Sequence, residues 1–469
     1  MRIKKPGRHF FLRFAAFIFT IMLCVSVYGQ AASARGLSLI RDAEIERVLL
    51  TIATPILEQA GFSAEGVRII IVNNSNLNAF VVNSQSIFIH TGLILRAENP
   101  EEIAGVIAHE ISHIASGHVV RTHAVAEGLS FQTLLTSLLG IAAAIGTGNS
   151  DAGLAIIKGG QAAALTNFLK HSRTQESAAD HGAMSYLNGA GVSPKGLLSF
   201  MEKLESEELL PESQQSEYIR THPLTTDRVN FLRRAVEKSR YKDKPLPRIW
   251  YQSFARVQAK LTGYLLPERA LRLRNTTSLP SVYARSIALY RKGKIDESLA
   301  LLDSLLEQEP QNGYFHELKG QILFEHGKVN AAAKSYAKAV ALAPDDLIKI
   351  DYGHVLVEQA RAAQSAGDIK KMHQILKTAI ATLQQAKRQE EKNPRLFNFL
   401  AIAYGIKGQE GYARLNLAEE AVLKNQLDVA GRQLSYAEAN LPKDASQARL
   451  RLQDLKQLVE QRRRKQKKK

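Results

Sequence analysis

The stretch from Val106 to Ile114 constrains this chain more than any other, because it sets two histidines and a glutamate at the spacing of a hydrolytic zinc site. In a helix, His109 and His113 lie on one face, so both imidazoles can reach a single metal ion. Glu110 lies beside them, where it can hold a metal-bound water and take its proton. The alternative is a coincidence of two histidines on an ordinary helix.

The local sequence favours a helix at this stretch. Asn99 is a typical N-cap residue, Pro100 suits the first helical position, and Glu102 supplies the carboxylate of a capping box. Apolar residues follow at Ile103 and beyond. The predicted start of the helix therefore agrees with the motif.

A second pair of acidic residues, Glu176 and Asp180, is also spaced four apart. In a helix, one carboxylate can bind the metal while the other, one turn on, orients a ligand histidine through its ring N–H. This predicts a two-histidine, one-glutamate site with an open fourth position. An exposed acidic face is the alternative, but the apolar residues that follow Glu176 predict a helix packed inside the domain.

Two further histidines, His118 and His123, follow the motif closely. The extended zinc pattern needs a glycine and a histidine at positions that Ser116 and Val119 occupy here. The third ligand must therefore come from elsewhere. We interpret His118 as a helix-end residue or as a residue that contacts a ligand from outside.

The segments around the motif predict an α+β domain. Residues 37–60 have apolar side chains at helical spacing, and residues 67–72, 79–82 and 86–89 have the composition of short strands. Such a small sheet could bind an extended peptide as one more strand, or it could only cover the metal helix. Residues 129–169 are apolar and rich in glycine. We expect two helices folded over the site as a lid, rather than a membrane hairpin whose arms would be shorter than about 20 residues.

The two ends of the chain carry much of its charge. The formal net charge is +17, but twelve cations lie in the first 13 and last eight residues, which leaves about +5 for the body. That balance does not suggest a nucleic-acid-binding fold. The basic tail is expected to be disordered, with contact to an anionic membrane as the alternative.

The N-terminus has the layout of a secretory signal peptide, with a basic segment, an apolar run and small residues up to Ala34. An uncleaved membrane anchor is the alternative. Cys24, the single cysteine, lies inside the apolar run, and the residues before it do not fit a lipoprotein signal. A mature chain would contain no disulfide, although it could live in an oxidising compartment.

The second half of the chain repeats itself. Gly293 and Gly327 are 34 residues apart, and so are Pro310 and Pro344, which is the period of tetratricopeptide repeats. We expect two clear repeats and two or more degenerate ones, which form a concave face for protein segments unless the array is only a stable appendage. The predicted division is signal peptide 1–34, zinc metalloprotease domain 35–241, linker and connecting helix 242–280, tetratricopeptide-repeat domain 281–460, and basic tail 461–469.

Three motifs together resemble one family. They are His109-Glu110-x-x-His113, Glu176-x-x-x-Asp180, and the sequence THPLTTDR at residues 221–228. In this order, behind a signal peptide and ahead of helical repeats, they resemble the BepA (YfgC) group of periplasmic zinc metalloproteases, which is related to the HtpX peptidases.

The resemblance implies a role for each site residue. It implies His109, His113 and Glu176 as ligands of one Zn²⁺ per chain, Glu110 as general base, and Asp180 as the residue that orients a ligand histidine. Local sequence alone makes His222, before a proline, only a histidine on a stiff turn. The resemblance implies instead that His222 is a reversible fourth ligand that keeps the protease latent.

The expected fold is a zincin-type (gluzincin) α+β domain followed by an all-α repeat solenoid. The implied function is a periplasmic zinc endopeptidase that degrades misassembled outer-membrane β-barrel proteins, with the repeats docking clients or their assembly machinery. A repeat-based chaperone or scaffold with a latent metal site is the alternative. The repeats lack cysteine, so a redox-controlled partner arrangement is not expected.

Overall fold

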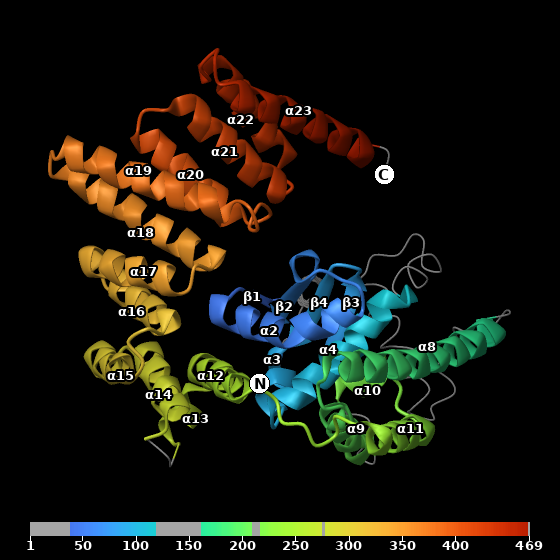
Figure 1. The fold of residues 1–469 in the computed structure, drawn as a ribbon. Helices are drawn as coiled ribbons and strands as arrows, with labels where there is room; N and C mark the ends of the chain where they lie inside the picture. Colours follow the sequence, from blue (N-terminus) through green and yellow to red (C-terminus); the bar gives the residue numbers. More distant parts are fainter. Residues whose placement is uncertain (1–37, 119–160, 209–215, 274–276, 468–469) are drawn as a thin grey trace, which may run out of the picture.

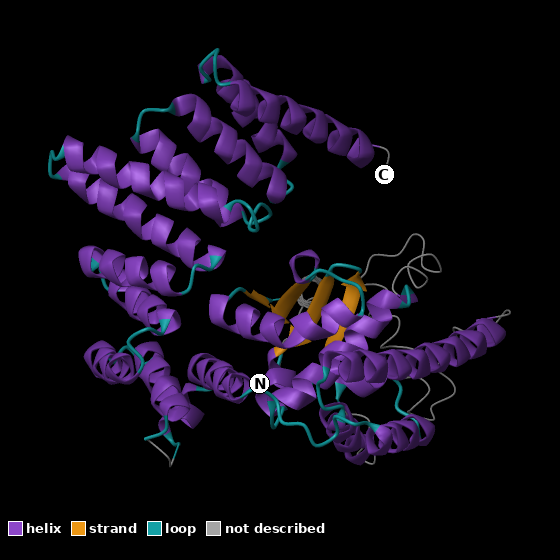
Figure 2. Cartoon of the chain, viewed as in Figure 1, coloured by secondary structure: helices purple, strands orange, loops and turns teal. Residues whose placement is uncertain are grey.

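The computed structural model describes residues 38–118, 161–208, 216–273 and 277–467. A small sheet flanked by helices forms the first half, and a curved array of helices forms the second (Figure 1, Figure 2). The prediction of an α+β domain followed by a helical repeat region is therefore confirmed. The predicted signal peptide and most of the predicted lid lie outside the described residues.

The first half contains these elements: β1 (Leu39–Ile40), α2 (Ala43–Gln59), η1 (Ala64–Gly66), β2 (Arg68–Val72), β3 (Ala79–Asn83), β4 (Ser86–His90), α3 (Thr91–Arg96), α4 (Pro100–Ala115), α8 (Gln161–Ala190), α9 (Lys195–Glu208), α10 (Glu217–Thr221) and α11 (Thr226–Lys238). The strands follow the order β1-β2-β4-β3. Strands β2 and β4 pair in parallel, and the other two pairs are antiparallel. The three predicted strands are present, β1 was not predicted, and β3 forms one edge of the sheet.

Helix α4, which contains His109 and His113, lies at the centre of this domain. It packs against α2, α8 and α9, and its apolar side chains join the core beneath the sheet. Two glycines allow the close packing of α4 and α9. A Cβ atom at Gly105 would lie 2.6 Å from the Leu197 backbone, and one at Gly196 would lie 2.1 Å from that of Glu101. Both distances are far inside van der Waals contact, so the two backbones approach as closely as they do because no Cβ is present.

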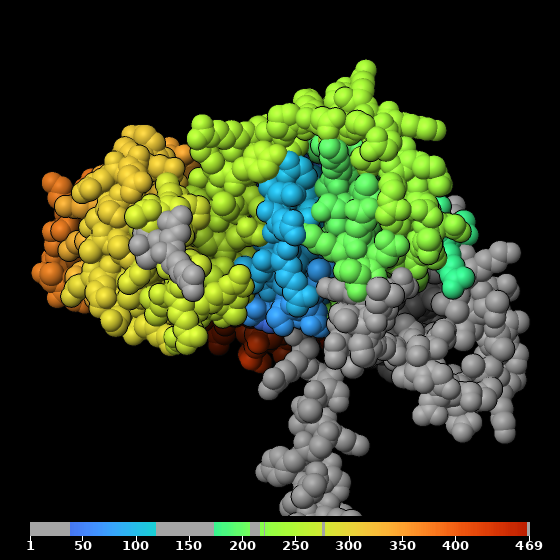
Figure 3. Space-filling model, turned by 90° about the horizontal axis from the view of Figure 1, so that it is seen from below, coloured from blue at the N-terminus to red at the C-terminus, as the bar shows by residue number. Residues whose placement is uncertain are grey.

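Helix α12 (Arg248–Leu265) joins the two halves. Phe254, Val257 and Leu261 belong to the core of the first half, whereas Ala259 belongs to the core of the first repeats. Viewed from below, the yellow-green surface of α12 lies between the blue N-terminal elements and the repeats (Figure 3). The hydrophobic core of the first half therefore runs past the predicted boundary at 241.

The second half consists of α13 (Pro267–Leu271), α14 (Leu279–Arg291), α15 (Ile295–Gln308), α16 (Gly313–Glu325), α17 (Val329–Leu342), α18 (Asp346–Ser365), α19 (Ile369–Ala386), α20 (Pro394–Ile406), α21 (Glu410–Leu423), α22 (Leu427–Asn440) and α23 (Ser446–Lys467). Gly293 (φ 77°) and Gly327 (φ 73°), which define the 34-residue period, occupy equivalent turns between paired helices. Only glycine adopts this backbone conformation without a steric penalty. The period therefore marks the turns.

The C-terminal end differs from its prediction. A disordered tail was expected from residue 461, but α23 continues to Lys467. Arg462 donates to the Val422 carbonyl at 3.0 Å, and Arg463 pairs with Asp428 at 2.8 Å. These contacts tie the basic residues to the preceding helices, and cations are favourable in the last turns of a helix.

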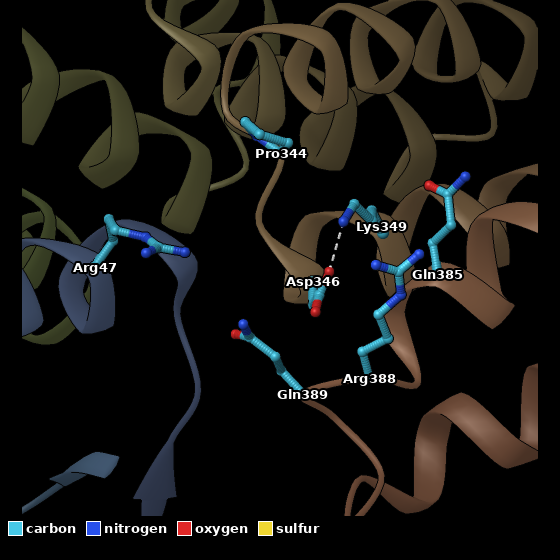
Figure 4. Close-up of a pocket in the computed structure, with 7 residues that line it drawn as sticks. All are labelled: Arg47, Pro344, Asp346, Lys349, Gln385, Arg388 and Gln389. Carbon is cyan, nitrogen blue, oxygen red and sulfur yellow. Dashed lines mark hydrogen bonds and ion pairs between the residues drawn. The ribbon is translucent and has the colours of Figure 1, made fainter. Parts of the chain in front are cut away.

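The two halves also meet through charged side chains. Arg41 pairs with Glu390 at 2.7 Å, and Arg47 pairs with Asp345 at 3.2 Å. Beside these contacts, a polar cavity of about 340 Å³ remains open, where Arg47 faces Lys349 and Arg388 from across the junction (Figure 4).

Among the described residues, no helix is both long enough and apolar enough to span a membrane.

Candidate metal centre

Helix α4 presents His109 and His113 toward the same point. Asn99 caps the helix by accepting a hydrogen bond from the Glu102 amide at 3.0 Å, and Pro100 occupies its first turn, as predicted. The Nε2 atoms of His109 and His113 lie 3.1 Å apart. Both side chains are buried, so the helix places two imidazole nitrogens at one interior position.

Helix α8 brings two carboxylates to opposite sides of His109. Glu176 Oε2 lies 3.2 Å from His109 Nε2, and Glu176 Oε1 lies 3.3 Å from His113 Nε2. Asp180, one turn later, places Oδ1 at 3.0 Å from His109 Nδ1. Glu176 therefore lies beside His109 Nε2, where a metal would bind. Asp180 contacts the opposite ring nitrogen, Nδ1, which such a metal would leave free.

His222 closes the same group from the end of α10. Its Nδ1 lies 3.2 Å from both Glu176 oxygens, and its Nε2 lies 3.3 Å from the Ala79 carbonyl oxygen. The His222 ring stacks on Tyr218 with a centroid distance of 4.4 Å. One donor atom each of His109, His113, Glu176 and His222 lies within 4.8 Å of the others.

Glu110 is fully buried beside these donors. Within the described part of the chain, neither of its oxygens has a hydrogen-bond partner, and His222 Nε2 lies 3.5 Å from Oε1. A buried carboxylate without a donor costs free energy, so its retention calls for a reason. Proton transfer to or from a bound water would be such a reason.

The geometry of the donors fits a divalent metal. Atoms bound to one Zn²⁺ at about 2.0–2.1 Å with tetrahedral angles lie roughly 3.4 Å apart. The separations among His109, His113 and Glu176 are 3.1 to 3.3 Å. Two imidazoles and a carboxylate are also the donor types that zinc prefers.

The charges fit as well. Glu110, Glu176 and Asp180 are three buried carboxylates, and the guanidinium of Arg228 contacts two of them. With neutral imidazoles, these four side chains carry a net charge of −2. A divalent cation would balance that charge in a site where an unpaired charge is costly.

The pKa shifts of the site residues follow from the same charges. Burial alone would lower the pKa of His109, but the close carboxylates of Asp180 and Glu176 outweigh burial and raise that pKa to about 9. Burial favours protonated carboxyls, yet Arg228 and the histidines hold the pKa values of Asp180 and Glu176 below their ordinary ranges. A proton on His109 thus supplies part of the positive charge that a metal would bring.

Three residues near the centre had no assigned role or only an uncertain one. His118 Nδ1 lies 2.9 Å from His113 Nδ1, the outer nitrogen, so His118 contacts a candidate ligand and does not join the donor group. His123 lies outside the described residues. Arg228 and Tyr218 were not singled out, because their contacts depend on how α10 and α11 pack against α8. The position of Arg228, six residues after His222 in the quoted motif, was the available signal.

Each half of the chain matches a known family model. Residues 39–236 match the model of Peptidase family M48, and residues 283–346 match that of a tetratricopeptide repeat. The beta-barrel assembly-enhancing protease of Yersinia pestis is 26% identical over 417 residues, which cover 86% of this chain and 81% of that protein. Its namesake in Escherichia coli K12 is 24% identical over 70% of this chain and 68% of that protein. The metalloprotease LoiP of Escherichia coli K12 is 31% identical over 34% of this chain and 58% of that protein.

Proposed function

We propose that this chain, whose first half matches Peptidase family M48 and whose second half matches a tetratricopeptide repeat, is a zinc-dependent endopeptidase of the periplasm. Its proposed clients are outer-membrane β-barrel proteins that have misassembled. The repeats would dock these clients or their assembly machinery. The names of the two relatives that align with most of the chain support this client class, and the predicted signal peptide supports the location.

The observation that carries the proposal is the buried convergence of His109, His113 and Glu176, with Glu110 beside them. We assign the first three as ligands of one Zn²⁺ and Glu110 as general base. Asp180 would orient His109. When bound, the metal supplies Lewis-acid chemistry, because it lowers the pKa of water and polarises a carbonyl. Glu110 would accept the proton of the attacking water and deliver it to the leaving amine.

The edge strand β3 offers a way to hold the client. An extended peptide can add to an open strand edge through main-chain hydrogen bonds, which makes few demands on its sequence. Residues of the segment 217–222, called here the His222 segment, lie at the start of this edge. The Tyr218 amide donates to the Leu77 carbonyl at 3.1 Å, and His222 Nε2 contacts the Ala79 carbonyl. The His222 segment would therefore have to move before a peptide occupies that part of the edge.

We assign His222 as a reversible fourth ligand that keeps the protease latent. Its position between Glu176 and Glu110 supports this assignment. With His222 in place, the fourth position is closed to water and substrate. His222→Ala should therefore raise the rate of casein cleavage, and an unchanged rate with unchanged metal content would remove the switch from the account.

Glu110→Gln tests the enzyme assignment. The amide keeps the shape of the side chain but cannot accept the proton, so cleavage of casein should fall to background while zinc content stays at the wild-type level. Normal turnover of client proteins by the variant would exclude the proposed reaction.

The closed position of His222 also favours a second candidate function, a repeat-based chaperone or scaffold whose metal site stays latent. Turnover of an unfolded β-barrel protein by the wild type and by Glu110→Gln separates the two, because both functions predict that the variant still captures this client. If the wild type and Glu110→Gln support client proteins equally well, the scaffold function is the correct one. If deletion of residues after 281 leaves client capture unchanged, the docking role of the repeats is wrong.

A further inference from the structure

Arg228 lies in the first turn of α11 and is 4% exposed. Its guanidinium forms a two-pronged contact with Asp180, in which Nε donates to Oδ2 at 2.6 Å and Nη2 donates to Oδ1 at 2.9 Å. The same Oδ1 lies 3.0 Å from His109 Nδ1. Because both carboxylate oxygens are held by a planar fork, Asp180 has one orientation in which to receive the His109 ring.

The third nitrogen of the guanidinium, Nη1, contacts groups other than Asp180. Nη1 donates to the Pro223 carbonyl at 2.8 Å and lies 3.2 Å from Glu176 Oε2. Pro223 directly follows His222, and Glu176 Oε2 is also 3.2 Å from His222 Nδ1. One side chain thus contacts the carboxylate that orients His109, the proposed ligand Glu176, and the backbone next to His222.

We propose that Arg228 is a positioning residue that couples the place of His222 to the orientation of the proposed metal ligands. The inference rests on the proposed function in taking His109 and Glu176 as ligands and His222 as a reversible one. When the His222 segment moves away, Nη1 loses the Pro223 carbonyl while Nε and Nη2 keep Asp180. When it returns, Nη1 sets the segment against Glu176.

Lysine cannot replace this geometry. Its ammonium keeps the positive charge but is a compact point charge, whereas the planar guanidinium holds three acceptors in fixed directions. Arg228→Lys therefore keeps the charge of the site and removes the link between Asp180 and Pro223. Arg233 provides a matched control on the same helix, since it is half-exposed and pairs with Glu202 at 2.8 Å.

The test is a double-mutant cycle on the full chain, with wild type, His222→Ala, Arg228→Lys and the double variant. The first readout is the rate at which a chromophoric chelator removes Zn²⁺. Replacing outer partners of metal ligands typically costs about 10–100-fold in metal affinity, so Arg228→Lys should speed removal by about tenfold or more. Arg233→Lys should leave the rate at the wild-type value.

The double-mutant cycle then tests whether Arg228 and His222 affect zinc removal independently of each other. If Arg228 sets the place of His222, the acceleration that His222→Ala causes alone should shrink to less than about twofold in the Arg228→Lys background. The absorption spectrum of Co²⁺-substituted Arg228→Lys should also shift toward that of His222→Ala. A merely structural role for Arg228 would not produce that spectral shift.

Three results would overturn the inference, and they are distinguishable. Multiplicative effects in the cycle, with a wild-type Co²⁺ spectrum for Arg228→Lys, would refute the coupling and leave the proposed function intact. No effect of His222→Ala alone would remove His222 as a ligand. A wild-type chain that binds no zinc would refute the proposed function as well. If circular dichroism shows that Arg228→Lys does not fold, Arg228→Gln takes its place in the cycle with the same expectations.

Discussion

The two halves of the molecule are built from contacts of different range. In the protease half, His109, Asp180 and Arg228 come from three helices and meet in one buried charged group. In the repeat half, each helix packs mainly against the next, and glycines such as Gly327 mark the turns. A substitution should therefore act through several elements in the first half and through one or two helices in the second.

Asp180→Ala should produce the largest effect, because it leaves the Arg228 guanidinium buried without its main partner. Breaking a buried ion pair by removing one partner costs about 3–5 kcal/mol, so the free energy of unfolding should fall by that amount and zinc affinity should fall with it. Urea unfolding and metal titration measure both. Asp428→Ala is the matched control, since its contact with Arg463 lies at the surface and should contribute less than about 1 kcal/mol. Equal losses in the two variants would contradict the comparison.

The second prediction concerns pH in the metal-free protein. The pKa of His109 is raised from 6.5 to about 9 in the folded chain. Its contribution is fully present below pH 6.5 and is lost as the pH rises through 9. The loss amounts to no more than about 3 kcal/mol, since one pKa unit corresponds to 1.36 kcal/mol. Urea unfolding with and without a chelator, at about pH 6 and about pH 10, checks this. The zinc-loaded protein should lack this dependence, and a chelated protein that is equally stable at both pH values would contradict the prediction.

Gly105→Ala and Gly405→Ala compare close packing in the two halves. A Cβ at Gly105 would lie 2.6 Å from the Leu197 backbone, whereas one at Gly405 in α20 would meet nothing within 4 Å. Overpacking should destabilise the first variant by about 1–3 kcal/mol. Alanine should stabilise the second by roughly 0.5–1 kcal/mol through helix propensity. Thermal unfolding measures both, and effects of the same sign would refute this difference in packing.

The junction between the halves is the place for the smallest effect. Buried Glu44 pairs with Arg256 at 3.1 Å and accepts a hydrogen bond from the Tyr283 hydroxyl at 2.9 Å. Tyr283→Phe removes that donor and should cost about 1 kcal/mol. Calorimetry should then show that the repeat half and the protease half unfold in two separate transitions. An unchanged single transition would mean that this contact does not couple the halves.

The sequence predicted features that depend on local spacing. The strands, the start of α4 and the histidine pair each follow from residues that are close together in the sequence, and the repeats follow from the 34-residue period of Gly293 and Gly327. Features that depend on packing were missed. Arg228 meets Asp180 across 48 residues, and no local pattern indicates that contact. Helix α12 contributes side chains to two cores, so a single domain boundary predicted from composition cannot describe it.

The prediction of a disordered C-terminal tail also failed because it used local sequence alone. A run of cations predicts disorder when it is considered alone. In the structure, Arg462 and Arg463 bond to residues some 35 to 40 positions earlier, so α23 stays helical.

Zinc stoichiometry tests the central claim, that three buried side chains from α4 and α8 form one metal site. Wild type and Glu176→Gln would be purified without added metal, reconstituted with Zn²⁺, desalted, and analysed by mass spectrometry of the metal. The account predicts one zinc per wild-type chain and a loss of most of it in Glu176→Gln. A wild-type chain that retains no zinc, or a variant that retains it fully, would contradict the account.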